Sequence, residues 1–228
     1  MRRNRAPLLT IALAALAAVL AGGCLFSPPE KDTGGGTTTV TYHAYTHPES
    51  LALNFVLCWE ARDIAEYRDN ILYDGILEAT DGEVYAAFTF YPVPGEVDPN
   101  TGDPLQPYLY EQEWQAVQRL FAGNDGFDGE NTIPGVRSIE AELTPSGADW
   151  AAPPTSDVEG DAFPDGTMWK RYSTSVLFTL KGTIPGTDIN GFNVVDALDF
   201  YAIPVTVGEG DDAHTEFRIW KWRDIDVQ

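Results

Sequence analysis

The first clear pattern of apolar residues in the chain is helical and lies between Thr46 and Leu72. Leu51, Phe55, Cys58 and Trp59 recur at intervals of three and four residues, which places them on one face of an α-helix. A stripe of this kind is buried against another part of the fold. The stretch therefore predicts the helix around which the rest of the chain packs.

Two start signals divide this helical stretch. Thr46 and Glu49 are spaced as a capping box, with Pro48 in the first turn, where its missing N–H costs nothing. Asp63 and Glu66 repeat the spacing, so we expect a second short helix after a change of direction at Asp63. The residues of this second helix that should face inward are Ile64, Tyr67 and Ile71. No Gly or Pro forces the break, and one continuous helix is the alternative.

Alternating patterns after Tyr73 predict a sheet interrupted by one more helix. In the first strand Phe88 and Phe90 share one face, and Tyr85 lies on the other. The predicted elements are a strand over 83–91, a helix over 111–123, a half-exposed strand over 133–143, a loop over 144–166, and long strands over 168–182, 193–207 and 216–225.

The last predicted strand is apolar or aromatic on both faces. Simple alternation places Arg218, Trp220 and Trp222 on one side, with Phe217 and Ile219 on the other. A strand of this composition is covered on two sides. We therefore expect helices on one face of the sheet and a loop, a second sheet or a partner on the other.

The N-terminal segment has the pattern of an export signal. Three arginines precede the apolar run 8–21, and small residues follow immediately before Cys24. A single-pass anchor is the alternative, but this run is shorter than the roughly 20 residues needed to span a bilayer. The segment LAGGC resembles the lipobox of bacterial lipoproteins, in which the signal is cut before the cysteine and that cysteine is acylated. The resemblance implies lipidation of Cys24 and a membrane-anchored protein of the bacterial cell envelope. In a double-membrane bacterium, the same resemblance implies the outer membrane, because Leu25, rather than Asp, follows the cysteine.

The residues after Cys24 predict a tether, and the charge of the chain limits its partners. Residues 24–45 are rich in Pro, Gly and Thr, which is typical of a flexible linker. Residues 1–23 hold three of the 14 basic residues and none of the 35 acidic ones, so their removal changes the formal charge from −21 to about −24. Such a surface repels phosphate backbones, and we expect no nucleic-acid partner. With Cys24 acylated, Cys58 has no disulfide partner, and we interpret it as a buried packing residue.

The order of two helices, a strand, a helix and four strands resembles the NTF2-like (SnoaL-like) family. The resemblance is carried by PESLALNFVLCWEARDIAEY, VYAAFTFY and FRIWKWRDI. It implies one α+β domain over residues 46–228, in which a curved antiparallel sheet wraps around a long N-terminal helix as a cone. The chain departs from the family in two long acidic loops, over 92–108 and 144–166. An immunoglobulin-like sandwich is disfavoured because it has no place for three amphipathic helices.

The resemblance also implies a cavity between the first helix and the sheet, where members of the family bind small molecules. Large side chains on the elements that line it are the pocket candidates: Trp59, Tyr85, Phe88, Tyr201 and Trp220. We expect a non-catalytic domain that binds a small hydrophobic ligand or a partner protein, with no cofactor. Two alternatives stay open: an isomerase, dehydratase or hydrolase that uses a pocket Asp, and a structural module that forms a homodimer.

Candidate catalytic residues come from the strand over 193–207. Asp196 and Asp199 interrupt its apolar pattern and fall on opposite faces, so at most one can face the cavity. Asp199 shares a face with Tyr201, and Arg218 on the final strand is a candidate neighbour. These three residues form the best candidate for acid–base chemistry. The alternative is that Asp199 and Arg218 form a structural ion pair.

The sequence holds no complete metal-binding motif. Three histidines, two of them beside the start of the first helix, cannot build a histidine-rich site. Hard oxygen ligands for calcium are spaced suggestively in two loops: Asp98, Asn100 and Asp103, and Asn124, Asp125 and Asp128. Gly135 stands where the twelve-residue calcium loop that starts at Asn124 needs a bidentate Glu. Solvated turns are therefore the favoured interpretation of both loops.

Overall fold

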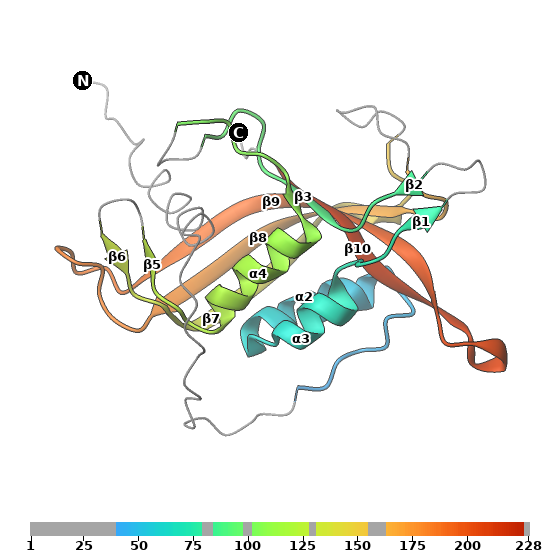
Figure 1. The fold of residues 1–228 in the computed structure, drawn as a ribbon, viewed down its shortest axis with the longest axis horizontal. Helices are drawn as coiled ribbons and strands as arrows, with labels where there is room; N and C mark the ends of the chain where they lie inside the picture. Colours follow the sequence, from blue (N-terminus) through green and yellow to red (C-terminus); the bar gives the residue numbers. More distant parts are fainter. Residues whose placement is uncertain (1–39, 79–83, 98–101, 128–130, 155–162, 226–228) are drawn as a thin grey trace.

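The computed structural model describes residues 40–78, 84–97, 102–127, 131–154 and 163–225, which form a mixed α+β fold (Figure 1). Its helices are α2 (Pro48–Ala61), α3 (Ile64–Glu66), the π-helix η1 (Tyr67–Ile71), α4 (Tyr110–Phe121) and the 3-10 helix η2 (Gly210–Asp212). Its strands are β1 (Leu77–Glu78), β2 (Val84–Tyr85), β3 (Thr89–Tyr91), β4 (Tyr108–Leu109), β5 (Gly126–Phe127), β6 (Thr132–Ile133), β7 (Val136–Ala151), β8 (Met168–Leu180), β9 (Gly191–Val207) and β10 (His214–Ile225).

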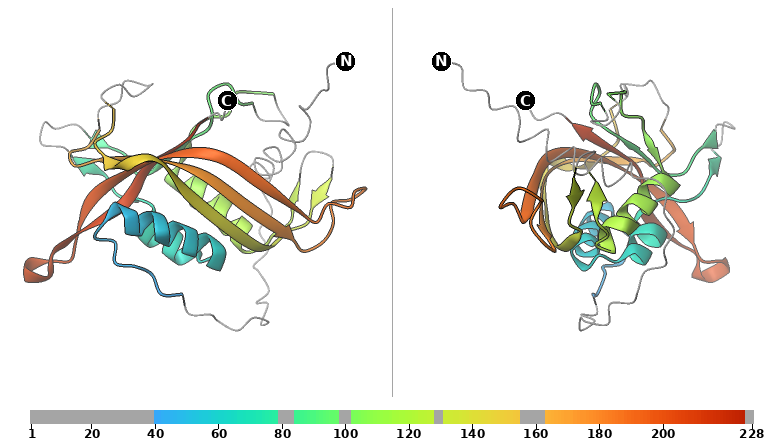
Figure 2. Two further views of the ribbon diagram at one scale, coloured as in Figure 1. Left: turned by 180° about the vertical axis from the view of Figure 1, so that it is seen from behind. Right: turned by 60° about the vertical axis from the view of Figure 1, so that its left-hand side comes forward.

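One curved six-stranded sheet organises the fold, in the order β4-β3-β10-β9-β8-β7. Helices α2, α3 and α4 lie together on its concave face (Figures 1 and 2). Neighbouring strands pair antiparallel, except that β3 runs parallel to β10. The prediction of a purely antiparallel sheet is therefore wrong at this pair. β3 and β10 are far apart in the sequence, so no hairpin joins them. Only strands joined by a hairpin must run antiparallel, and β3 can therefore pair with the free edge of β10 in parallel.

Helix α2 begins one residue later than predicted. Its N-cap is His47, whose carbonyl oxygen accepts the Ser50 N–H at 3.0 Å, and Pro48 is the first helical residue. Thr46 is therefore not the cap. The helix ends at Ala61, and its C-cap Arg62 lies in the left-handed region with φ 54°. A left-handed residue cannot continue a right-handed helix, so the single continuous helix is excluded.

The predicted break at Asp63 is confirmed. The Asp63 carboxylate accepts the Glu66 N–H at 3.1 Å and caps α3, which passes directly into the π-helix η1. Tyr67 and Ile71 face inward as expected and are fully buried, whereas Ile64 is only partly buried. The change of direction lets the two helical segments present their apolar residues to the same core.

The packed part of the chain begins before the predicted boundary at residue 46. Tyr45, which lies in the predicted tether, is buried in the core, and its carbonyl oxygen accepts the Phe217 N–H of β10 at 2.8 Å. The fully buried Asn54 of α2 binds both the N–H and the carbonyl oxygen of His43 at 2.8 Å. These bonds satisfy backbone groups that burial would otherwise leave unpaired.

Two predicted segments differ in extent from the structure. The strand expected over 83–91 is divided into β2 and β3, although Tyr85 and Phe88 point to opposite sides of the sheet as predicted. The loop expected from Thr144 is strand up to Ala151, which pairs with Trp169. Side chains on both faces of this end of β7 are exposed, so the sequence shows no apolar alternation there. The register of this end is set by its pairing with β8.

The main core lies between the helices and the concave face. Phe55 of α2 is at its centre, with ring centroids 5.2 Å from Phe200 and 5.4 Å from Trp222. A smaller cluster covers the opposite face and consists of Tyr85, Tyr201, Ile203 and Trp220 with Phe163 packed against it. Both faces are therefore covered over residues 198–203 of β9 and 218–221 of β10, as predicted for the last strand, whereas Val195 of β9 is exposed.

A β-bulge in β10 changes which side chains face the helices. Ile219 pairs with Ala202 and Lys221 pairs with Tyr201, so Trp220 is an extra residue in β10. Beyond it the alternation is reversed, and Trp222 packs against α2. The predicted grouping of Trp222 with Arg218 and Trp220 is therefore wrong.

Within the described residues, no helix has the length and apolar character needed to cross a bilayer. The predicted signal segment and Cys24 lie outside these residues.

Candidate functional site

The candidate site is a partly open cavity of about 70 Å³ between helix α2 and strands β8, β9 and β10. Its walls are largely apolar, and its polar groups are the carboxyls of Asp196 and Asp224 and the hydroxyl of Thr174. The other lining residues are Phe55, Trp59, Val176, Phe178, Val194, Leu198 and Trp222. An apolar cavity with a few convergent polar groups is the usual form of a small-molecule site.

Strand geometry brings the two acidic residues to the same cavity. Asp196 lies on β9 between Val194 and Leu198 in the alternation that faces α2. Asp224 is aligned with Leu198 across the β9–β10 pair, and it faces the cavity because the bulge at Trp220 reverses the alternation of β10. The carboxyl-bearing residues are thus diagonal neighbours on adjacent strands.

The environment of Asp224 favours its protonated form. Burial raises the pKa of Asp224 well above its usual range, and the nearby Asp196 raises it further. The Trp222 indole N–H donates to Asp224 Oδ1 at 3.0 Å, and this hydrogen bond lowers the pKa of Asp224 and so partly offsets the increase. The Asp196 carboxylate accepts the Ala197 N–H at 2.7 Å. The cavity therefore has a carboxyl group whose protonated form is favoured more than that of an exposed aspartate.

A further buried acid, Glu113, lies on α4. Burial raises the pKa of Glu113 to about 7, although the Tyr67 hydroxyl, which donates to its Oε1 at 2.8 Å, partly offsets the increase. The charge of Glu113 also raises the pKa of Asp224. Sequence reasoning missed Glu113, but a signal was present. It stands four residues before Val117 and seven before Leu120, on the buried stripe of the helix.

The predicted catalytic residues do not form one site. Asp199 is buried on the face of the sheet opposite the helices, where its carboxylate accepts two hydrogen bonds from Arg171 at 2.7 and 2.8 Å. Arg218 instead donates to Glu216 at 2.8 Å, and its guanidinium lies 5.0 Å from the centroid of the Tyr45 ring. The cause is register, because Arg171 is the direct cross-strand partner of Asp199 and Arg218 is aligned with Ile203. The expected pairing of Asp199 with Arg218 is wrong.

The predicted pocket residues are divided between the two faces of the sheet. Trp59 lines the cavity, and Phe88 is fully buried in the same core without lining it. Tyr85, Tyr201 and Trp220 belong to the smaller cluster on the opposite face, where the Trp220 indole N–H donates to the Ala86 carbonyl at 3.0 Å. They therefore contribute no surface to this cavity.

Three of the calcium candidates, Asp103, Asn124 and Asp125, lie in the part of the chain that the structure describes. The Asp125 carboxylate accepts the Gly135 N–H at 2.8 Å and so stabilises the loop before β7, while Asn124 and Asp103 are exposed. In the part of the chain that the structure describes, no group of three or more His, Cys, Asp and Glu residues could hold a metal ion. The remaining candidates, Asp98, Asn100 and Asp128, lie outside that part.

Cys58 fits its interpretation as a packing residue. Its side chain has no exposed surface, and its thiol donates to the Asp63 carbonyl at 3.0 Å. Burial raises the pKa of this thiol, followed by the charges of Asp63 and Glu66. A buried thiol with a raised pKa is a poor nucleophile.

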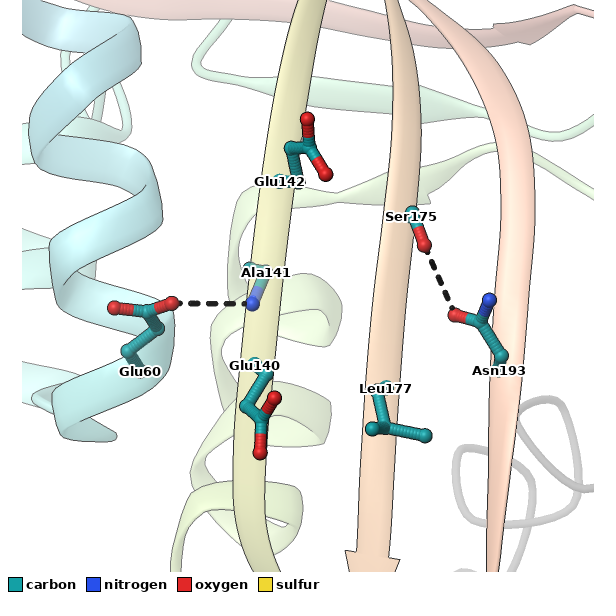
Figure 3. A pocket seen from close by; sticks show the side chains of 7 residues that line it. All are labelled: Glu60, Glu140, Ala141, Glu142, Ser175, Leu177 and Asn193. Atoms are coloured by element: carbon teal, nitrogen blue, oxygen red, sulfur yellow. Dashed lines mark hydrogen bonds between the residues drawn. The ribbon is translucent and has the colours of Figure 1, made fainter.

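An open groove of about 530 Å³ lies on the outer side of β7, β8 and β9 (Figure 3). Glu60 reaches it from α2, and its carboxylate accepts the Ala141 N–H of the edge strand β7 at 3.3 Å. The other lining residues are Glu140, Glu142, Ser175, Leu177 and Asn193, with Ser175 and Asn193 joined by a hydrogen bond of 3.1 Å. Glu60 thus accepts a backbone N–H that would otherwise be unpaired at the sheet edge. The groove is more open than the cavity beneath α2.

Comparisons with known proteins found likenesses only among solved structures. No protein-family model matches the chain, and no curated protein matches it. The chain is similar to a candidate aromatic ring hydroxylase from Novosphingobium aromaticivorans, with 11% identity, a TM-score of 0.42, and coverage of 78% of this chain and 84% of that one. It is also similar to a conserved protein from Planctomyces limnophilus, with 12% identity, a TM-score of 0.36, and coverage of 78% and 94%. At these values neither neighbour bears on the ligand or activity of this chain.

Proposed function

We propose that this chain is an exported bacterial lipoprotein whose single domain, an NTF2-like cone, binds a small ligand without catalysis in the cavity beneath α2. The observation that carries the ligand-binding part is the cavity itself, with its aromatic and aliphatic walls and the carboxyls of Asp196 and Asp224. Burial of a ligand against such walls supplies affinity, and a few polar groups supply orientation.

Support for the NTF2-like assignment comes from the arrangement of the elements. The curved six-stranded sheet has α2, α3 and α4 on its concave face, and α2 packs against the long strand β7 (Figure 2). The cavity lies between the first described helix and the sheet, where the family resemblance implies a ligand site.

A substitution in the cavity wall tests the proposed site. Val194 lines the cavity, whereas its neighbour Val195 is 63% exposed on the opposite face. The full chain is screened against small neutral, cationic and anionic compounds by thermal shift, and each hit is repeated on Val194→Phe and Val195→Phe. Hits should stabilise the wild type and Val195→Phe but not Val194→Phe, because the larger ring fills the cavity. Equal stabilisation of both variants would place the ligand elsewhere.

The anchor part of the proposal depends on Cys24 and its LAGGC context. Wild-type chain expressed in a double-membrane bacterium should fractionate with membranes, and Cys24→Ser should move to the soluble fraction. Acyl chains supply about 0.8 kcal/mol for each buried methylene group, so loss of the acylated residue removes the binding energy. Complete retention of the variant in membranes would mean that another segment anchors the protein.

A second candidate function, an enzyme with a cavity acid, is favoured by one observation. Burial raises the pKa of the cavity residue Asp224, and a carboxyl whose pKa is raised towards the operating pH is better suited to general acid or base catalysis than an exposed one. Compounds from the screen are incubated with wild type and Asp224→Asn and followed by mass spectrometry. Conversion by the wild type that is lost in the variant supports catalysis, and recovery of every compound unchanged supports binding alone.

A further inference from the structure

The cavity beneath α2 contains acidic side chains and no basic ones. Its ten lining residues include Asp196 and Asp224, and none is Lys, Arg or His. Acidic groups of three surrounding elements raise the pKa of Asp224: Asp196 of β9, Glu96 of the loop after β3 and Glu113 of α4. A positively charged ligand group would therefore be attracted by the acidic side chains that line the cavity.

Aromatic rings enclose the same space. Trp222 lies 5.4 Å from Phe55 and 6.4 Å from Trp59, measured between ring centroids, and all three residues line the cavity. The indole N–H of Trp222 donates to Asp224 and thereby fixes the carboxyl beside the ring. Aromatic faces attract organic cations, and Trp attracts them most strongly. Carboxyl groups among aromatic rings are a suitable environment for an ammonium group.

The size and polarity of the cavity limit the kind of cation. Its volume of about 70 Å³ is several times the roughly 10–15 Å³ of such space that a cavity needs to hold one water molecule, so it admits a head group of a few non-hydrogen atoms. A calcium ion needs six to eight oxygen ligands, whereas the only side-chain oxygens here belong to Asp196, Asp224 and Thr174. Apolar walls cannot supply the missing ligands. An alkylammonium group needs fewer hydrogen-bond acceptors and gains from contact with the rings.

We propose that the cavity beneath α2 binds the ammonium head group of a small organic amine, with Asp196 and Asp224 as its acceptors and Phe55, Trp59 and Trp222 as its aromatic walls. This inference rests on the proposed ligand-binding function and names the ligand class. The alkyl part of the amine extends toward the opening of the cavity, because the enclosed volume is too small for the whole molecule.

Three probes of similar size and different charge test the ligand class: butylammonium chloride, 1-butanol and sodium butyrate. Binding to the full chain at pH 8 is measured by titration calorimetry and by the NMR signal of the Trp222 indole N–H, assigned with a Trp222→Phe variant. Butylammonium should bind at least tenfold more tightly than butanol and shift this signal. Butyrate should not bind. Affinity for butylammonium should fall with decreasing pH, because protonation removes the charge of Asp224, whose pKa burial and the acidic neighbours Asp196, Glu96 and Glu113 raise.

Matched Asp-to-Asn variants identify the acceptor. Asp224→Asn should weaken butylammonium binding at least tenfold and weaken butanol binding much less, whereas Asp211→Asn in the exposed 3-10 helix η2 should change neither. Asp224→Asn should fold, since it removes a carboxyl whose ionisation burial opposes. Thr174→Val, which preserves side-chain volume, provides a second variant with an altered cavity wall.

The outcomes separate this inference from the proposed function. Equal binding of butanol and butylammonium, or butylammonium binding that survives Asp224→Asn, would overturn the ammonium inference and leave ligand binding in the cavity intact. Absence of binding by all three probes would also overturn it, while the comparison of Val194→Phe with Val195→Phe would still decide whether the cavity is a ligand site.

Discussion

The buried pair of Glu113 and Tyr67 makes the stability of the domain depend on pH in a predictable direction. Burial raises the pKa of Glu113 from 4.5 to about 7. A carboxyl whose pKa is higher in the folded state does not change the free energy of unfolding below pH 4.5. It lowers this free energy increasingly between pH 4.5 and 7, and by its full amount above pH 7. At about 1.4 kcal/mol for each pKa unit, this effect is at most about 3 kcal/mol.

Replacing Glu113 with Gln removes the ionisation and keeps an oxygen that can accept the Tyr67 hydroxyl hydrogen bond. Glu113→Gln should therefore match the wild type in free energy of unfolding at pH 4 and exceed it by up to about 3 kcal/mol at pH 8. Urea unfolding of both proteins at intervals from pH 4 to 8 measures the difference. Asp224 titrates in both proteins, so its contribution largely cancels in the comparison.

Glu111→Gln is the matched control for this experiment, because Glu111 lies in the same helical turn and is exposed. Glu111→Gln should change the free energy of unfolding only slightly at every pH. A stability difference between Glu113→Gln and wild type that stays constant from pH 4 to 8, or that is largest at pH 4, would contradict the assignment of Glu113 as a destabilising buried acid.

Three further changes test separate parts of the fold. Asp63→Ala removes the N-cap of α3 and should cost about 1 kcal/mol in urea unfolding, whereas Asp63→Asn should retain most of the stability. Arg171→Met leaves the buried carboxylate of Asp199 without its two hydrogen bonds and should cost about 2 kcal/mol, recovered in part by adding Asp199→Leu. In a Cys24→Ser background, Cys58 should react with a disulfide reagent only after addition of denaturant, and rapid labelling of the native protein would refute its assigned burial.

Local signals predicted the helices well. The apolar spacing of Leu51, Phe55 and Trp59 located α2, and Asp63 marked the true break. The conformation of Arg62 could not be read in this way, since nothing in its side chain requires positive φ. The structure imposes that conformation because both α2 and the following segment bury apolar residues in one core.

The candidate site was harder to predict, because the strands that form it carry apolar residues on both faces. Alternation correctly placed Asp196 and Asp199 on opposite sides of β9, but both sides are apolar, so the pattern did not show which side faced the helix. The position of Asp224 depends on the bulge at Trp220. A bulge is a property of pairing between strands and leaves no mark in the alternation of a single one.

The bulge at Trp220 also bears on how such a site can arise by mutation. Residues beyond it face the cavity only because β10 is one residue longer than the matching part of β9. A one-codon insertion in a regular strand therefore brings Trp222 and Asp224 to the inner face together, and a one-codon deletion returns both to the outer face. Point substitutions would have to change each position separately. The indole and the carboxyl that it holds are thus gained or lost as one heritable unit, in a single step.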